Sequence, residues 1–211
     1  MKDRLMLVLI IVLLISISSG CKQDLHHWSS VKINQKIIKS KDFSVTSEST
    51  GLETSVRGTV FLSGEEGVPK HAQIVAMIDI DPKDWGGVGI QLTDQWNIAS
   101  ITSSYPEETH DITPEELATV WTTGGETEHG WNKRIEIGRA DLWTPSGGGR
   151  GTIVIELEIN NKYKKKTDSE GFSMTVGVGS EEKDGIKSVH PDWKLIEIPL
   201  YNSNDEQKKK K

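Results

Sequence analysis

TIVIELEI, residues 152–159, decides the fold of this 211-residue chain. Every second residue of the stretch, from Ile153 to Ile159, is a large aliphatic one, whereas Glu156 and Glu158 lie between them. Successive side chains of a β-strand point to opposite faces of the sheet, so a period of two with one apolar face predicts a strand buried on one side. Such strands need a second layer to cover their apolar face.

Seven further segments carry strand signals, at residues 57–63, 72–80, 87–92, 96–101, 131–137, 172–178 and 194–200. The segment AQIVAMIDI, at 72–80, is nearly continuously apolar, which predicts a central strand covered on both faces. The short link Thr93-Asp94-Gln95 predicts a hairpin between the strands that flank it. About eight short strands separated by glycine and proline predict an all-β fold. We expect an antiparallel two-sheet β-sandwich with either an immunoglobulin-like or a jelly-roll strand order.

One segment has the signals of a helix. Thr113 stands at an N-cap position, Pro114 follows at the first helical position, and Glu116 at the third completes a capping box. The pair Gly124-Gly125 provides a stop signal after the apolar residues. The sequence therefore predicts one short helix near residues 113–123.

The composition is that of a globular protein, with 35% hydrophobic and 27% charged residues. We predict one sandwich domain at residues 42–201, after a polar spacer at 21–41 and before a polar tail at 202–211. The formal net charge of -6 disfavours nucleic acid as a partner, because an acidic surface does not attract phosphate backbones. The four lysines that end the tail fit a solvated end or a weak contact with an anionic membrane or wall polymer.

The N-terminus predicts export. Lys2 and Arg4 precede an unbroken apolar stretch at residues 5–15, and small and polar residues lead from it to Cys21. At about 1.5 Å per residue, this stretch covers only about half of a bilayer core of about 30 Å. It is therefore too short for a membrane span and fits a secretory signal peptide at residues 1–20.

Ser18-Ser19-Gly20-Cys21 resembles the lipobox of bacterial lipoproteins, with Ser18 where that family usually carries an aliphatic residue. The resemblance implies that the Cys21 thiol takes a diacylglyceryl group and that a signal peptidase cuts just before it. The mature protein would then be lipid-anchored on the extracytoplasmic face of the cell membrane, where two acyl chains give stable retention. Cys21 is the only cysteine, so no internal disulfide can form, and a lipid would account for the leftover thiol.

Seven tryptophans are the strongest compositional feature. Indole rings provide flat apolar faces on which sugars stack, and they anchor protein interfaces. A sandwich also buries some tryptophans in its core. Trp85, Trp131 and Trp143 lie beside predicted turns, so we predict them as ligand-binding residues. In size and strand pattern the domain is similar to bacterial surface β-sandwiches such as cohesin and carbohydrate-binding modules.

Two clusters contain residue types that bind metals. Asp79, Asp81 and Asp84 end a predicted strand, but the run lacks the glycine and closing glutamate of a calcium loop and also fits an ordinary turn. Residues 126–129, with His110-Asp111 nearby, lack the ligand spacing of a zinc site. We therefore predict no metal and no cofactor.

Familiar catalytic motifs do not occur in the sequence. There is no Gly-x-Ser-x-Gly nucleophile elbow, and the glycine-rich segment at 145–151 precedes a strand instead of a helix, unlike a phosphate-binding loop. The favoured hypothesis is a lipid-anchored surface protein without enzymatic activity that binds a glycan or an envelope protein. Two alternatives remain open, an envelope glycan hydrolase with paired carboxylates and a structural envelope component without intrinsic activity.

Overall fold

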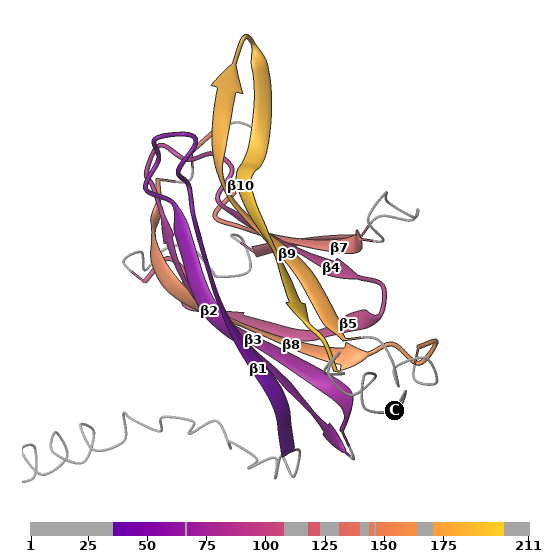
Figure 1. Ribbon diagram of the computed structural model, residues 1–211. Helices are drawn as coiled ribbons and strands as arrows, with labels where there is room; N and C mark the ends of the chain where they lie inside the picture. The colour runs from indigo at the N-terminus through magenta and orange to yellow at the C-terminus, as the bar shows by residue number, and fades with distance from the viewer. Residues whose placement is uncertain are drawn as a thin grey trace, which may run out of the picture. The chain divides into compact units, whose positions relative to one another are not determined.

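The computed structural model describes residues 36–65, 67–107, 118–122, 131–139, 144–145, 147–163 and 171–200. Within these residues the regular structure consists of ten β-strands, arranged in two antiparallel sheets of five that pack against each other (Figure 1). The prediction of a two-sheet β-sandwich is confirmed. This described part contains no helix with the length and apolarity that crossing a membrane requires.

The first sheet has the strand order β1-β2-β3-β8-β5. Its members are β1 (Lys36–Thr46), β2 (Ser55–Glu65), β3 (Val68–Ile80), β8 (Gly149–Ile159) and β5 (Trp96–Ser103). β8 contains the stretch that predicted the fold, and it pairs with β3 so that Ile155 lies opposite Ile74. The most regular apolar alternation in the sequence thus lies inside its sheet, between β3 and β5.

The second sheet has the order β10-β9-β4-β7-β6. Its members are β10 (Ile186–Ile198), β9 (Phe172–Lys183), β4 (Val88–Thr93), β7 (Trp131–Ile137) and β6 (Ala118–Thr122). All eight predicted strands occur in one sheet or the other, most of them within longer strands. β1 and β6 are additional strands.

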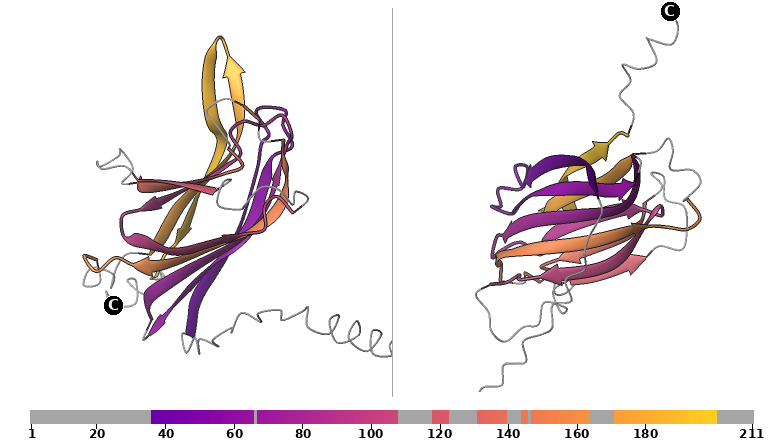
Figure 2. Two further views of the ribbon diagram at one scale, coloured as in Figure 1. Left: turned by 180° about the vertical axis from the view of Figure 1, so that it is seen from behind. Right: turned by 90° about the horizontal axis from the view of Figure 1, so that it is seen from below.

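The hydrophobic core lies between the two sheets (Figure 2). The inner strands contribute every second residue to it, as the fully buried Ile153 and Ile155 of β8 illustrate. Trp96 of the first sheet and Phe172 of the second meet edge to face, with ring centroids 5.5 Å apart. The period of two in the sequence therefore corresponds to burial on one face.

β3 is covered on one face only, so the prediction of cover on both faces is wrong. Its residues alternate between buried and accessible positions, and Met77 is 52% exposed. Among the described residues, the second sheet is the layer that packs on β3, and it covers one side. The apolar residues of 72–80 on the other side face outward as partly exposed side chains.

The predicted hairpin between β4 and β5 is also wrong, because the two strands belong to different sheets. Residues after β8 bind the link that joins them. The backbone N–H of Asn160 donates to the carbonyl of Gln95 at 2.7 Å, and the Tyr163 hydroxyl bonds to the carboxylate of Asp94. These contacts take the place of a ladder between β4 and β5, and the chain crosses from one sheet to the other.

The predicted helix near 113–123 is wrong where the structure describes it, because residues 118–122 form β6. The other residues of that range lie outside the described part. Thr119, Val120 and Trp121 have side chains that favour a strand. Pairing with β7 places Val120 opposite Ile135, so that tertiary contacts outweigh the helix start signal.

β1 begins at Lys36, inside the segment predicted as a spacer. Its first half has Ile37 and Ile38 side by side between lysines and lacks apolar alternation, which is why the sequence pattern does not reveal it. The strand lies at the edge of its sheet, where lysines are common. Lys39 bonds to the carbonyl of Pro199, and Lys41 donates to the carbonyl of Glu197 at 2.8 Å, so both side chains join β1 to the end of β10.

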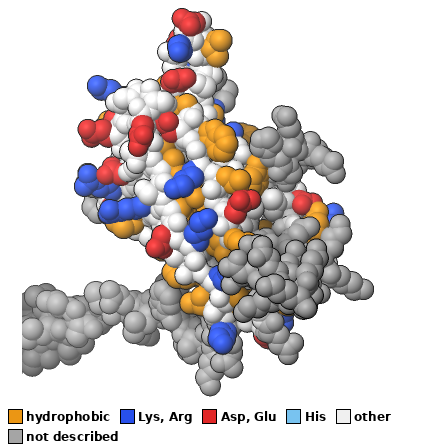
Figure 3. All heavy atoms as spheres, viewed as in Figure 1, with side chains coloured by type: hydrophobic (Ala, Val, Ile, Leu, Met, Phe, Trp, Pro, Cys, Tyr) orange, Lys and Arg blue, Asp and Glu red, His pale blue; other side chains and the backbone are white. Residues whose placement is uncertain are grey.

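A hairpin joins β9 and β10 through Asp184-Gly185. Both residues have positive φ, 54° and 75°, as a two-residue turn of type I′ requires. The ladder between β9 and β4 ends at Val178, whereas the ladder between β9 and β10 continues to the turn. The end of the hairpin therefore extends past the other strands (Figure 1). Its tip carries acidic, basic and hydrophobic side chains (Figure 3). Ile186, which follows the turn, is exposed.

Candidate functional site

The register of the second sheet defines which side chains lie on its outer face. Ile90 of β4 is buried in the core, so its neighbours Gly89 and Gln91 face outward. Gln91 lies opposite Thr175 of β9 on one side and opposite Arg134 of β7 on the other. These three polar residues form a row across the sheet.

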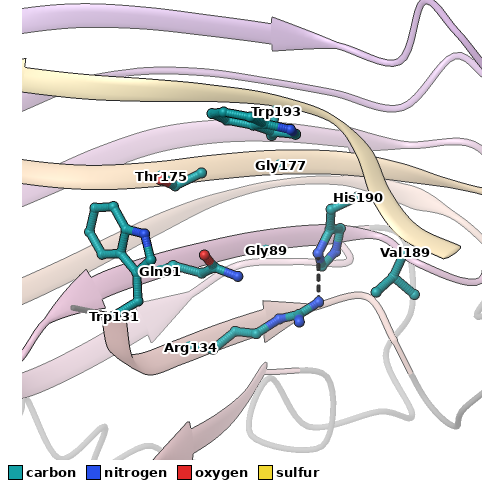
Figure 4. Close-up of a pocket in the computed structure, with 9 residues that line it drawn as sticks. All are labelled: Gly89, Gln91, Trp131, Arg134, Thr175, Gly177, Val189, His190 and Trp193. Atoms are coloured by element: carbon teal, nitrogen blue, oxygen red, sulfur yellow. Dashed lines mark hydrogen bonds between the residues drawn. The ribbon is translucent and has the colours of Figure 1, made fainter. Parts of the chain in front are cut away.

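A groove with a cavity volume of about 300 Å³ lies on this outer face. Four strands or their ends line it with Gly89, Gln91, Trp131, Arg134, Thr175, Gly177, Val189, His190 and Trp193. Figure 4 shows Trp131 and Trp193 on opposite sides of the groove, with Thr175 and Gln91 between them. Arg134 and His190 lie together at one end. The groove thus combines aromatic sides with a polar floor.

Gly89 and Gly177 make room for the side chain of His190. A Cβ atom on Gly89 would lie 2.3 Å from Cε1 of the imidazole ring, and one on Gly177 would lie 2.7 Å from the Cβ of His190. The two glycines are opposite each other in β4 and β9, so the ring rests on backbone. His190 has a φ of 56° and lies at an irregularity between Val189 and Asp192, where the register with β9 shifts.

The hydrogen bonds of His190 define its tautomer. Nε2 lies 2.8 Å from the carbonyl oxygen of Gly86, which can only accept, so Nε2 carries the hydrogen. Nδ1 then accepts from Nη2 of Arg134 at 2.8 Å. Burial, followed by the positive charge of Arg134, lowers the pKa of His190 to about 3. The ring is therefore a neutral acceptor near neutral pH.

Arg134 is also held by Glu136, which is only 5% exposed. Oε1 of Glu136 lies 2.9 Å from Nη2 of Arg134 and accepts from Nη1 of Arg139 at 2.8 Å. Oε2 accepts from the indole nitrogen of Trp121 at 2.9 Å. Burial lowers the pKa of Arg134, yet a guanidinium remains protonated in proteins, so the end of the groove is cationic.

The three tryptophans predicted to bind ligand do not share one position in the structure. Trp131 lines the groove. Trp85 does not line it; Nζ of Lys187 lies 5.8 Å from the centroid of its ring, within the range of a cation–π contact. Trp143 lies outside the described residues, as does the predicted lipid attachment site, Cys21.

Sequence reasoning did not identify Trp193, His190 or Arg134 as site residues. The turn signal Asp184-Gly185 was present and indicates that β10 returns along β9. Counted from that turn without interruption, Trp193 would lie opposite Val176, which faces the core. The shift at His190 places it opposite Gly177 instead, on the outer face.

The three aspartates at the end of β3 have partners within the fold. Asp79 pairs with Arg150 at 2.7 Å. Asp81 accepts two backbone N–H groups, at 2.8 and 3.0 Å, and these bonds lower its pKa. Asp84 is fully buried. Within the described residues, no three His, Cys, Asp or Glu side chains are placed to hold a metal ion. The segments 110–111 and 126–129, which contain potential zinc ligands, lie outside them.

The nine described residues that line the groove include no carboxylate. They provide two indoles, neutral hydrogen-bonding groups and one permanent cation, a combination suited to binding. No protein-family model matches the chain, and no curated protein matches it in sequence. The function therefore has to follow from the chemistry of the groove.

Proposed function

We propose that this protein is a surface-displayed binding module that takes a sugar chain in the groove between Trp131 and Trp193. A lipid on Cys21 holds it on the extracytoplasmic face of the cell membrane. The observation that carries the binding proposal is the pair of indoles on opposite sides of one groove, with Gln91 and Thr175 between them.

Sugars have apolar C–H faces and equatorial hydroxyl groups, and the groove has groups that can bind both. Indole rings offer large, rigid apolar surfaces at a small entropic cost, and Gln91 provides both donors and an acceptor. Trp131 lies on β7 and Trp193 on β10, three strand spacings apart, which is about 14 Å across the sheet. That separation exceeds one sugar ring, so the proposed ligand is an oligosaccharide or a longer chain.

Replacing Trp193 by alanine is expected to weaken binding of a recognised oligosaccharide about tenfold or more, equivalent to about 1.4 kcal/mol. The side chain is 63% exposed, so its removal leaves the core intact and acts on the ligand contact. Titration calorimetry against a panel of oligosaccharides measures the affinity without depending on tryptophan fluorescence.

Ile186→Ala provides the matched control, because Ile186 is an exposed apolar residue at the hairpin tip that does not line the groove. Its affinity should equal that of the unmodified protein. If no oligosaccharide binds, or if Trp193→Ala binds as well as Ile186→Ala, the groove is not a sugar site, and an envelope protein becomes the favoured partner. Steady release of reducing ends from a bound chain would instead support the alternative of a glycan hydrolase.

Replacing Cys21 by alanine is expected to move the protein from the detergent phase to the aqueous phase in a detergent partition experiment. The thiol is the attachment point of the proposed lipid, and without two acyl chains the polar mature chain has little affinity for the membrane. Cys21→Ser serves as a second variant of similar size. Retention of either variant in the detergent phase contradicts the lipid anchor and leaves the binding proposal untouched.

A further inference from the structure

The charge at the end of the groove indicates what kind of sugar chain fits. Among the described residues that line the groove, Arg134 is the only one with a permanent charge, and His190 beside it is neutral. The protein as a whole carries a net charge of -6, so the positive charge of Arg134 in the groove is a local feature of opposite sign.

The carboxylate next to Arg134 is shared with other donors. Glu136 contacts two guanidinium groups, because its Oε1 lies 2.9 Å from Nη2 of Arg134 and 2.8 Å from Nη1 of Arg139. Its Oε2 accepts from the indole N–H of Trp121. Glu136 therefore does not pair with Arg134 alone.

Arg134 also keeps donors that the described residues do not use. Its contacts with Glu136 and His190 both involve Nη2. Within the described part of the chain, no bond involves Nη1, whereas Nε has no hydrogen-bond partner but is closed to solvent, so Nη1 is the donor left for a ligand. A guanidinium has five N–H donors in a planar fork that suits a carboxylate or a phosphate. The side chain is 29% exposed, so a ligand in the groove can reach it.

The protonation of His190 is consistent with a positive potential at this end. Burial is the main cause of its lowered pKa, and the charges of Arg134 and Arg139 lower the pKa further. A field that opposes a proton on the imidazole favours an anion in the same place.

We infer that the groove binds an anionic sugar chain, whose carboxylate or phosphate group pairs with Arg134 while its rings stack on Trp131 and Trp193. The inference rests on the proposed sugar-binding function and adds the charge of the ligand. The shared chemistry is an oxyanion on a sugar, which a uronic acid or a sugar phosphate can supply.

The test compares the binding of three oligosaccharides of equal length to the full-length protein by titration calorimetry. One is an oligouronate, one is the same chain with its carboxyl groups reduced to alcohols, and one carries phosphate esters. The affinity for the oligouronate or for the phosphorylated chain should be at least about tenfold higher than the affinity for the neutral chain, because the neutral chain cannot form a charge-assisted bond to Arg134. This preference should shrink as salt rises from about 0.05 to about 0.5 M.

Arg134→Gln should reduce the affinity ratio between anionic and neutral chains to near one, and Arg134→Lys should retain part of it. The ratio is informative even where a variant lowers both affinities, because a general distortion of the groove affects both chains. Arg150→Gln is the matched control, since Arg150 is a 74% exposed arginine in the first sheet, and its ratio should stay unchanged.

The outcomes separate the two proposals. Equal binding of anionic and neutral chains overturns the anionic assignment and supports a neutral sugar ligand. Binding of none of the three contradicts the sugar-binding function itself, and the anionic assignment with it. A preference for anions that survives Arg134→Gln places the anion elsewhere and overturns the role of Arg134. The ratio between the uronate and phosphate chains identifies the source of the oxyanion.

Discussion

The Asp84→Ala variant is expected to lose about 3–5 kcal/mol of unfolding free energy. The carboxylate of Asp84 is fully buried and accepts from the Thr54 hydroxyl at 2.5 Å, the Ser180 hydroxyl at 2.6 Å and the backbone N–H of Gly86 at 2.8 Å. Alanine leaves these three donors without their acceptor in a site closed to water. Urea denaturation followed by circular dichroism measures the loss.

The position of Asp84 explains why so large an effect is expected from a residue after β3. Thr54 immediately precedes β2 of the first sheet, whereas Ser180 belongs to β9 of the second. One carboxylate therefore joins the two sheets through hydrogen bonds. Asp79→Ala is the control, because Asp79 forms an exposed ion pair that contributes at most about 1 kcal/mol. Equal losses for the two variants would show that Asp84 does not connect the sheets in this way.

Acidification is expected to destabilise the protein through His190, by about 3 kcal/mol between about pH 7 and about pH 4. The folded state holds His190 neutral with a pKa of about 3, whereas an unfolded histidine has a pKa of about 6.5. Between these two values the unfolded state binds more protons, so stability falls as the pH falls. The contribution is fully present above about pH 6.5 and is lost progressively toward about pH 3.

Urea midpoints measured across this pH range check the prediction, with His190→Asn as the matched variant. Asparagine tolerates the positive φ of 56° at this position and has no proton to gain. Carboxylates contribute to the pH dependence of the unmodified protein and of the variant alike. The difference between their curves of stability against pH therefore gives the contribution of His190. We expect the variant to be less stable at neutral pH and to have the shallower slope in this range. Parallel curves would contradict a neutral buried imidazole.

His190 also connects stability to the proposed site. Its ring lies between the glycines of β4 and β9 and accepts from Arg134, the cation on which the anionic ligand assignment depends. The folded state keeps the ring neutral down to its pKa of about 3, so the contact with Arg134 persists in the folded protein while acid favours unfolding. Acid between about pH 7 and about pH 4 is therefore expected to reduce the folded population without protonating His190 in the folded state.

Much of the fold was predictable because strand formation leaves a local pattern. Alternation of apolar residues identified eight strands, including the stretch at 152–159 that became β8. The sequence pattern did not identify β1 and β6, because edge strands bury fewer side chains and their apolar residues alternate less regularly. The segment at 113–123 carried helix start signals that act locally, whereas pairing of β6 with β7 depends on residues distant in sequence.

The candidate site was only partly predictable. The proximity of Trp131 to a glycine marked it as accessible, and it lines the groove, but the same reasoning selected Trp85, which does not. Turn proximity indicates exposure and says nothing about which side chains converge. Gly89 and Gly177 illustrate the limit, since their role is to leave space for a ring that arrives from another strand.

The sequence by itself determined that this chain folds as a two-layer β-sandwich, because a period of two gives each strand one apolar face, and a chain made almost entirely of strand signals has mainly other strands to bury it against. Only the tertiary structure decided where the groove lies and what lines it. The register shift beside His190 moves Trp193 from a core-facing position to the outer face. That shift arises from pairing between strands, and no local pattern of residues reports it.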